Sequence, residues 1–174
     1  MFKPQPGDYN SYFQRYIDMV HREPILEMRR SMHIMHALLT TVTEEQANYR
    51  YAEGKWSVKE VLMHIIDVER VFLFRALCAS RKDQQILQSF EDQEYINNCD
   101  AGSRSMESLL AEHEAVRVAS IRFFEGLSEE MLDRKATMAN GSFITPRAVA
   151  FVIVGHEMHH QNVLQERYVG KINP

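Results

Sequence analysis

The amino-acid sequence predicts an all-α protein, a four-helix bundle with a short extra helix at its N-terminus. The 174 residues include only 7 Gly and 5 Pro, which leaves little material for turns and favours a few long helices over many short strands. Four long segments carry apolar residues at helical spacing, and each begins at a recognisable start signal. A chain of this length can bury a core without disulfides, so we expect one domain over residues 1–174.

The chain begins with a short helix followed by a long one. The short helix is expected over residues 11–20. Pro24 suits the first turn of a second helix that runs to about Thr41, because the fixed φ of proline is already helical. Thr43 and Gln46 match a capping box for a brief further helix. The long helix has one apolar face, formed at helical spacing by Ile25, Met28, Met32, Met35, Leu39 and Val42.

A second capping box starts the next long helix. Ser57 and Glu60 form it directly before a run of apolar residues, and predict a helix from about Ser57 to Arg81. Residues 82–104 are rich in Asp, Gln, Asn and Ser, which indicates a long connection. Such a connection can cross the bundle and set two helices parallel, so the helices need not alternate in direction.

A third long helix and a tight turn follow. Ser105 can cap this helix, and Gly126 is well placed to stop it. The pair Asn140-Gly141 is a tight-turn signal, which predicts a small hairpin over residues 137–143.

The last helix carries the clearest chemical signal. Thr145 and Pro146 match an N-cap and a first helical residue, and the helix is expected to reach about Tyr168. Within it His156 and His160 lie four residues apart, on one helix face, where two imidazoles can converge on one metal ion. Two ligands do not complete a site, so at least one more must come from elsewhere.

Two known designs fit the rest of the chain poorly. Residues 156–160 match the H-E-x-x-H pattern of zinc peptidases, but the extended form needs Gly and His where this chain has Val163 and Glu166. A di-metal carboxylate bundle needs two Glu-x-x-His pairs, and Glu157 with His160 is the only such pair. A mononuclear site with an upstream third ligand is the better interpretation.

The other histidines differ in how well they suit the third position. His64 is the best candidate, because it lies in a strongly capped helix beside an apolar face. His36 flanks the core face of its own helix and is the second choice. His21, His33 and His113 stand among charged residues and are expected to be solvated.

The segment GKWSVKEVLMHIID at residues 54–67, together with GHEMHH at residues 155–160, resembles the DinB/YfiT-like superfamily over nearly the whole chain. The resemblance implies a four-helix bundle in up-down-down-up order. It also implies one metal ion held by a His on the second long helix and an H-x-x-x-H pair on the last. Carried over by motif, the ligands are His64, His156 and His160. We expect one divalent transition metal ion, Zn or Ni, although three imidazoles also suit Co, Fe and Cu.

Neighbouring residues have alternative roles. Glu157 is a candidate catalytic residue, a general base on metal-bound water, but a structural role, supporting a ligand or solvated, is favoured. His159 points away from the face of the predicted pair and is not expected to be a ligand. Asp67 could orient an imidazole or pair with Arg70 or Arg75.

Three functional hypotheses follow for such a site, and the activities known in the family favour the first. The first is a thiol-dependent S-transferase, in which the metal activates a low-molecular-weight thiol against an electrophilic small molecule. The second is a metal-dependent hydrolase, in which metal hydroxide attacks a carbonyl. The third is a non-enzymatic binding or regulatory module. The family also implies a homodimer.

Composition excludes other partners. The net charge of -4 and the pI near 6.1 argue against a nucleic-acid-binding surface, which needs clustered Lys and Arg. The sequence has no apolar run of signal-peptide or membrane-span length, so we expect a cytoplasmic protein that does not bind membranes. Cys78 and Cys99 form no CxxC pair and indicate neither a disulfide framework nor a thiolate zinc site.

Overall fold

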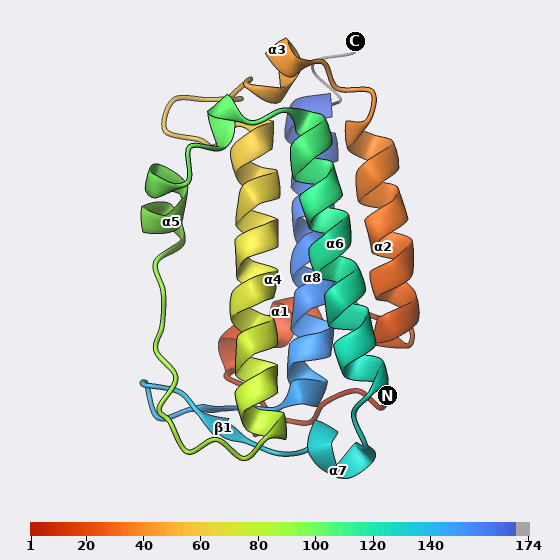
Figure 1. Ribbon diagram of the computed structural model, residues 1–174, viewed down its shortest axis with the longest axis vertical. Coiled ribbons are helices and arrows are strands. Elements are labelled where there is room, and N and C mark those ends of the chain that lie inside the picture. Colours follow the sequence, from red (N-terminus) through yellow and green to blue (C-terminus); the bar gives the residue numbers. More distant parts are fainter. Residues whose placement is uncertain (170–174) are drawn as a thin grey trace.

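Four long helices form the frame of the protein in the computed structural model, which describes residues 1–169 (Figure 1). Two of them, α2 and α8, run upward in Figure 1, whereas α4 and α6 run downward. The chain order is therefore up-down-down-up, as the resemblance implies. The bounds of these helices are Pro24–Leu39 for α2, Val58–Ser80 for α4, Met106–Glu125 for α6 and Pro146–Leu164 for α8.

The predicted caps start these helices. The hydroxyl of Ser57 accepts from the backbone N–H of Glu60, and the Glu60 carboxylate accepts from the Ser57 N–H at 2.6 Å. Ser105 and Thr145 each accept from the backbone N–H three residues further on. Side-chain oxygens thus satisfy N–H groups that a helix start leaves without partners, which fixes where α4, α6 and α8 begin.

A long crossover makes α4 and α6 parallel. It climbs the length of the bundle on the left of Figure 1 and contains two short helical segments, α5 and η2. The predicted connection at residues 82–104 is correct in extent, but it is not free of structure. Backbone hydrogen bonds of Leu87 with Thr137 and Ala139 tie it to the small hairpin. The bounds are Asp92–Asn98 for α5 and Ala101–Ser103 for η2.

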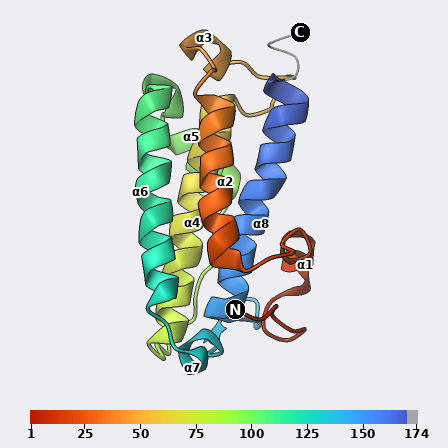
Figure 2. The same cartoon turned by 90° about the vertical axis from the view of Figure 1, so that its right-hand side faces the viewer.

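Short elements lie at the two ends and along one side of the bundle. The N-terminal helix is shorter than predicted and consists of η1 and α1, and α1 packs against the side of α8 (Figure 2). In the hairpin, Ala136 pairs with Ile144 and Thr137 with Phe143, around the predicted turn. The bounds are Ser11–Phe13 for η1, Gln14–Ile17 for α1, Glu44–Ala47 for α3, Glu129–Leu132 for α7, Ala136–Thr137 for β1, Phe143–Ile144 for β2 and Gln165–Val169 for η3, a π-helical turn after α8.

The apolar core is divided into two clusters by a polar layer. Each of α2 and α4 contacts both α6 and α8. One cluster fills the end of the bundle next to the hairpin, and the other fills the end next to α3. On α8 the clusters use residues 148–154 and Leu164, so the turns between them carry buried polar side chains instead.

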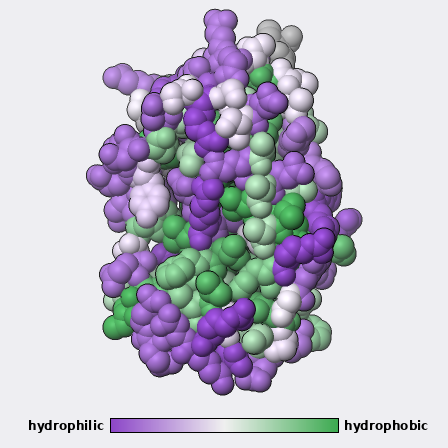
Figure 3. Space-filling view, in the orientation of Figure 1, coloured by the Kyte–Doolittle hydropathy of each residue, from purple (hydrophilic) through white to green (hydrophobic). Residues whose placement is uncertain are grey.

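Outside the core, the helices differ in polarity. Apolar surface gathers over the lower half of the face in Figure 3, and the exposed apolar side chains of α4 and α6 include Phe74, Leu77 and Val118.

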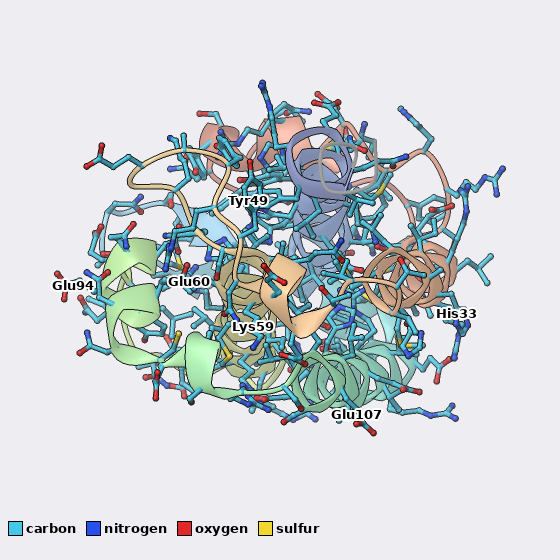
Figure 4. All side chains as sticks on the ribbon, turned by 90° about the horizontal axis from the view of Figure 1, so that it is seen from above. His33, Tyr49, Lys59, Glu60, Glu94 and Glu107 are labelled. Carbon is cyan, nitrogen blue, oxygen red and sulfur yellow. The ribbon has the colours of Figure 1, made fainter. Side chains whose placement is uncertain are left out.

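Seen from above, His33 points outward from α2, which agrees with its expected solvation (Figure 4). In the described part of the chain, no helix combines the length and apolar character that crossing a membrane requires.

A fully buried guanidinium stands in the polar layer and contacts all four long helices. Arg117 of α6 donates to the Glu69 carboxylate of α4 through Nε and Nη2, at 2.9 and 2.8 Å. Its Nη1 donates to the Met28 carbonyl oxygen of α2 at 3.1 Å, and its Nη2 also donates to Glu157 of α8. Two carboxylates therefore balance one cation where water has little access.

Two further polar side chains complete this layer. Gln161 donates to the Glu157 carboxylate at 3.1 Å and to the Ser31 carbonyl oxygen at 2.7 Å, which links α8 to α2. His113 lies 3.5 Å from Glu157 and is only 2% exposed. The expectation that His113 is solvated is wrong. Its charged sequence neighbours, Glu112 and Glu114, suggested a solvated position, but His113 lies on the inner face of α6, one turn before Arg117.

Replacing Arg117 by Met should lower the free energy of unfolding by about 3–5 kcal/mol, because two buried carboxylates lose their counter-charge. Urea denaturation followed by circular dichroism measures this loss. Arg122→Met is the matched control on the same helix, because Arg122 is exposed and, among residues 1–169, pairs only with Glu125. The control should lose less than about 1 kcal/mol. Equal losses in the two variants would contradict the assigned importance of the buried network.

Candidate metal centre

Three histidines converge between α4 and α8. His64 lies in the second turn of α4, and His156 and His160 lie one turn apart on α8. The Nε2 atoms of His64 and His156 are 3.0 Å apart, and those of His156 and His160 are 3.1 Å apart. One ring nitrogen from each histidine lies within 4.8 Å of the other two. The structure thus brings together the three predicted ligands, from stretches of chain about ninety residues apart.

The geometry of the three nitrogens suits one small cation. A tetrahedral ion with bonds of ~2.0–2.1 Å places its ligand nitrogens roughly 3.3 Å apart, a few tenths of an ångström more than the two contacts here. A ring nitrogen offers one proton or one lone pair, so Nε2 of His156 can satisfy one of its two neighbours well, but not both. A cation between the three rings would use all three lone pairs at once.

Burial keeps these imidazoles neutral. It lowers the pKa of His64 to about 4. Burial, reinforced by the neighbouring His64, lowers the pKa of His160 to about 3, and the pKa of His156 falls well below its ordinary value for the same reasons. Neutral imidazole is the form that binds metals, so the lone pairs need no deprotonation at neutral pH.

A close backbone contact holds α1 against the cluster. The Tyr16 ring meets the His156 ring edge-on, with centroids 5.3 Å apart. This approach depends on Gly155, since a Cβ there would lie 2.1 Å from the Tyr16 carbonyl oxygen. The glycine directly before His156 therefore lets α1 cover one side of the site.

The crossover covers the other side. Trp56 packs on His64 with ring centroids 4.7 Å apart, and its Nε1 donates to Gln93 of α5 at 3.0 Å. The Asp92 carboxylate lies 4.0 Å from Nδ1 of His64, the nitrogen that faces away from the cluster. Asp92 was not singled out from the sequence, because an acidic residue in a polar connection carries no periodic signal.

The remaining candidates lie outside the cluster. His36 is exposed, with its Nδ1 3.0 Å from the Thr40 hydroxyl. His159 is exposed and packs against the Tyr16 ring. Asp67 lies 3.6 Å from Arg70, one of the two partners considered for it.

The Glu157 carboxylate belongs to the buried ion network and is 0% exposed. Burial by itself would raise the pKa of Glu157, but Arg117 and His113 outweigh that effect and hold it at about 2. Its contacts are with Arg117, His113 and Gln161 and with none of the three clustered histidines, which favours a structural role over that of a general base.

Two cavities flank the histidine cluster. One, of about 270 Å³, includes His156 in its wall and is otherwise bordered mainly by apolar side chains of α1, α4 and the crossover. The other, of about 310 Å³, includes His160 in its wall and is bordered by Trp56, Lys55 and Gln93 among others. Each cavity therefore reaches a different histidine of the same cluster.

A tight backbone contact at Gly155 can be tested directly. Gly155→Ala should destabilise the protein by about 1–3 kcal/mol, because the new methyl group forces α1 away from α8. Thermal unfolding measures the loss. In the control Gly126→Ala the nearest atom to the new Cβ is 3.5 Å away, so stability should change by less than about 0.5 kcal/mol. A Gly155→Ala protein as stable as this control would contradict the assigned contact.

Sequence comparison finds related proteins. The model of the DinB superfamily matches residues 27–164. A Geobacillus thermodenitrificans protein, named as a candidate metal-dependent hydrolase, is 24% identical over 140 residues, which are 80% of this chain and 79% of the relative. A Bacillus licheniformis protein of the same designation is 20% identical over 135 residues, 77% of each chain.

Structure comparison finds the same fold in two solved proteins. YfiT from Bacillus subtilis, described as a candidate metal-dependent hydrolase with an unusual four-helix bundle topology, matches with a TM-score of 0.76 at 15% identity, over 95% of this chain and 90% of its own. The mycothiol-dependent maleylpyruvate isomerase matches with a TM-score of 0.70 at 14% identity, over 91% of this chain and 66% of its own.

Proposed function

The chain belongs to the DinB superfamily, and from that premise we propose that it is a metal-dependent enzyme that joins a low-molecular-weight thiol to an electrophilic small molecule. His64, His156 and His160 are the proposed ligands of one divalent transition metal ion, with Zn or Ni expected. Relatives named for metal-dependent chemistry and the convergence of three neutral imidazoles both support this centre.

The observation that carries the proposal is the pair of cavities that meet at the histidine cluster. A transfer between two organic molecules needs room for both of them, whereas hydrolysis needs one organic substrate and water. The cavity at His156 is mainly apolar, and the cavity at His160 has polar groups such as Lys55 and Gln93. This difference suits an electrophile with a carbon skeleton on one side and a polar thiol on the other.

The surroundings of the cluster also favour a thiol. A divalent cation bound there would lower the pKa of a coordinated thiol so that it ionises at neutral pH. Hydrolysis would call for a carboxylate near the ion to act as general base on water. In residues 1–169 no carboxylate lies close enough to join all three histidines, and Glu157 is bound by Arg117. A metal-bound thiol that ionises at neutral pH needs no general base. Trp56 and Tyr16, which cover the imidazoles, would keep bulk water from competing.

Hydrolysis is the second candidate, and the names of the two sequence relatives favour it. Water would then occupy the place of the thiol. The mycothiol-dependent isomerase, which shares the fold, supports the use of a thiol instead.

Metal content tests the proposed centre. Protein purified without an affinity tag should contain about one divalent ion per chain, and His64→Ala, His156→Ala and His160→Ala should each lose it, because two imidazoles rarely retain such an ion. Elemental analysis measures this, with circular dichroism to confirm folding. His36→Ala and His159→Ala are the controls and should keep the ion. Retention of metal by folded His64→Ala would refute the ligand set.

Activity tests the reaction class. Metal-loaded protein should consume glutathione, coenzyme A, cysteine or mycothiol in the presence of 1-chloro-2,4-dinitrobenzene, faster than metal-free protein. In this reaction the sulfur bonds to the ring carbon, chloride leaves with the electron pair of the broken C–Cl bond, and the thiol proton passes to solvent. Cleavage of ester or amide substrates without thiol consumption would instead establish the hydrolase.

A further inference from the structure

One buried arginine differs from the others in its partners. Arg75, Arg117 and Arg147 are the buried arginines of the described chain, and each is at most 5% exposed. Arg117 and Arg147 are each bound by two carboxylates. Within residues 1–169 no carboxylate lies within 4.0 Å of the Arg75 guanidinium. A buried cation without a carboxylate is costly, so it calls for a physical explanation.

The contacts of Arg75 leave most of its donors unused. In the described chain its single hydrogen bond runs from Nη2 to the Gln88 carbonyl oxygen, at 3.0 Å. The guanidinium also lies over the rings of Phe72 and Phe90, 4.9 and 5.6 Å from their centroids. A guanidinium has five N–H groups, so Nε and Nη1 remain without partners.

These unpaired N–H groups are not fully buried. The described part of the chain has three buried side-chain polar atoms without partners, at His113, Arg134 and Arg147, and none belongs to Arg75. The unpaired nitrogens of Arg75 therefore keep some exposure, and Arg75 borders two cavities: the one of about 270 Å³ at His156 and a second of about 420 Å³ on the crossover side. Burial lowers the pKa of Arg75 from its ordinary value, and Asp92 opposes this effect from a distance.

The cavity of about 270 Å³ is shared by Arg75 and the histidine cluster. Its wall includes Arg75, Phe72 and Phe90 as well as His156. His64 and Arg75 are eleven residues apart on α4, about 16 Å along the helix axis, and the arginine side chain leans back toward His64. The volume of about 270 Å³ is near the lower limit for small-molecule sites, which are typically ~300–1,000 Å³.

We propose that Arg75 binds a carboxylate of the electrophilic substrate, so that this cavity selects small apolar molecules with a carboxylate at one end. The planar fork of a guanidinium matches a carboxylate through two parallel hydrogen bonds. A molecule held in this way directs its other end toward His156. This inference rests on the site named in the proposed function, but it concerns binding and not turnover.

Asp92 is the acidic residue in the wall of this cavity, as the described chain shows it. Its side chain is half exposed. The Asp92 carboxylate lies 4.0 Å from Nδ1 of His64 and, in the described chain, forms no ion pair with Arg75. Asp92 would therefore discriminate against dicarboxylates whose second acid reaches it.

Isothermal titration calorimetry of the full-length protein as purified tests the proposal. The probes are 3-phenylpropionate and its uncharged analogue 3-phenylpropionamide. The wild type should prefer the carboxylate by about tenfold to a hundredfold, the contribution expected of charge-assisted hydrogen bonds. Arg75→Met should lose this preference, and Arg75→Lys should retain part of it. Equal affinity for the two probes in the wild type, no binding of either, or a preference that survives in Arg75→Met would overturn the proposal.

Arg70→Gln is the matched control, because Arg70 is on the same helix but is exposed and pairs with Glu112 and Asp67. It should keep the preference. Ligand-free Arg75→Met should melt within about 4 °C of the wild type, since it removes a cation without a carboxylate partner. If Arg75→Met lost as much free energy of unfolding as Arg117→Met, Arg75 would be a structural residue and the proposal would be overturned. A carboxylate preference without thiol transfer would refute only the proposed function.

Discussion

The contact of Arg117 with Glu69 and Glu157 is the constraint on which the rest of the structure depends. One guanidinium joins α6 to α4 and α8, and its Nη1 donates to the Met28 carbonyl oxygen of α2. Because buried charges tolerate little displacement, these contacts fix how each helix is rotated about its axis. Consecutive residues of a helix differ by about 100° in direction. With Glu157 held toward Arg117, His156 is directed to the adjacent side of α8, where α4 presents His64.

The ion network and the histidine cluster thus occupy the same turns of α8, in one polar layer between two apolar clusters. Apolar packing above and below holds the helices at a fixed separation, and the polar layer sets their register. A metal centre needs ligand atoms positioned to within a few tenths of an ångström, which rigid helices with supported side chains provide better than loops. The buried ion network holds α8 in the rotation that directs His156 toward His64.

The parallel arrangement of α4 and α6 has a consequence for the site. A connection between parallel helices must return along the whole bundle, and here it supplies walls to both cavities. Phe90 and Asp92 border the cavity at His156, and Gln93 borders the cavity at His160. On the opposite side, Gly155 allows α1 to approach within backbone contact. The bundle therefore supplies the three clustered histidines, while the segments outside it shape the space around them.

The sequence by itself determined the features that depend on local chemistry. The caps at Ser57, Ser105 and Thr145, the turn at Asn140-Gly141 and the spacing of His156 and His160 are encoded within a few residues, so they could be predicted. The residues alone made His64 only the first choice over His36, and the family resemblance strengthened that choice, because no local rule says which distant helix faces α8. Only the tertiary structure decided that His113 is buried, that Glu157 faces Arg117, and that Asp92 and Arg75 lie beside the site. These facts depend on helix rotation and on the path of the crossover, which arise from contacts between residues far apart in the chain.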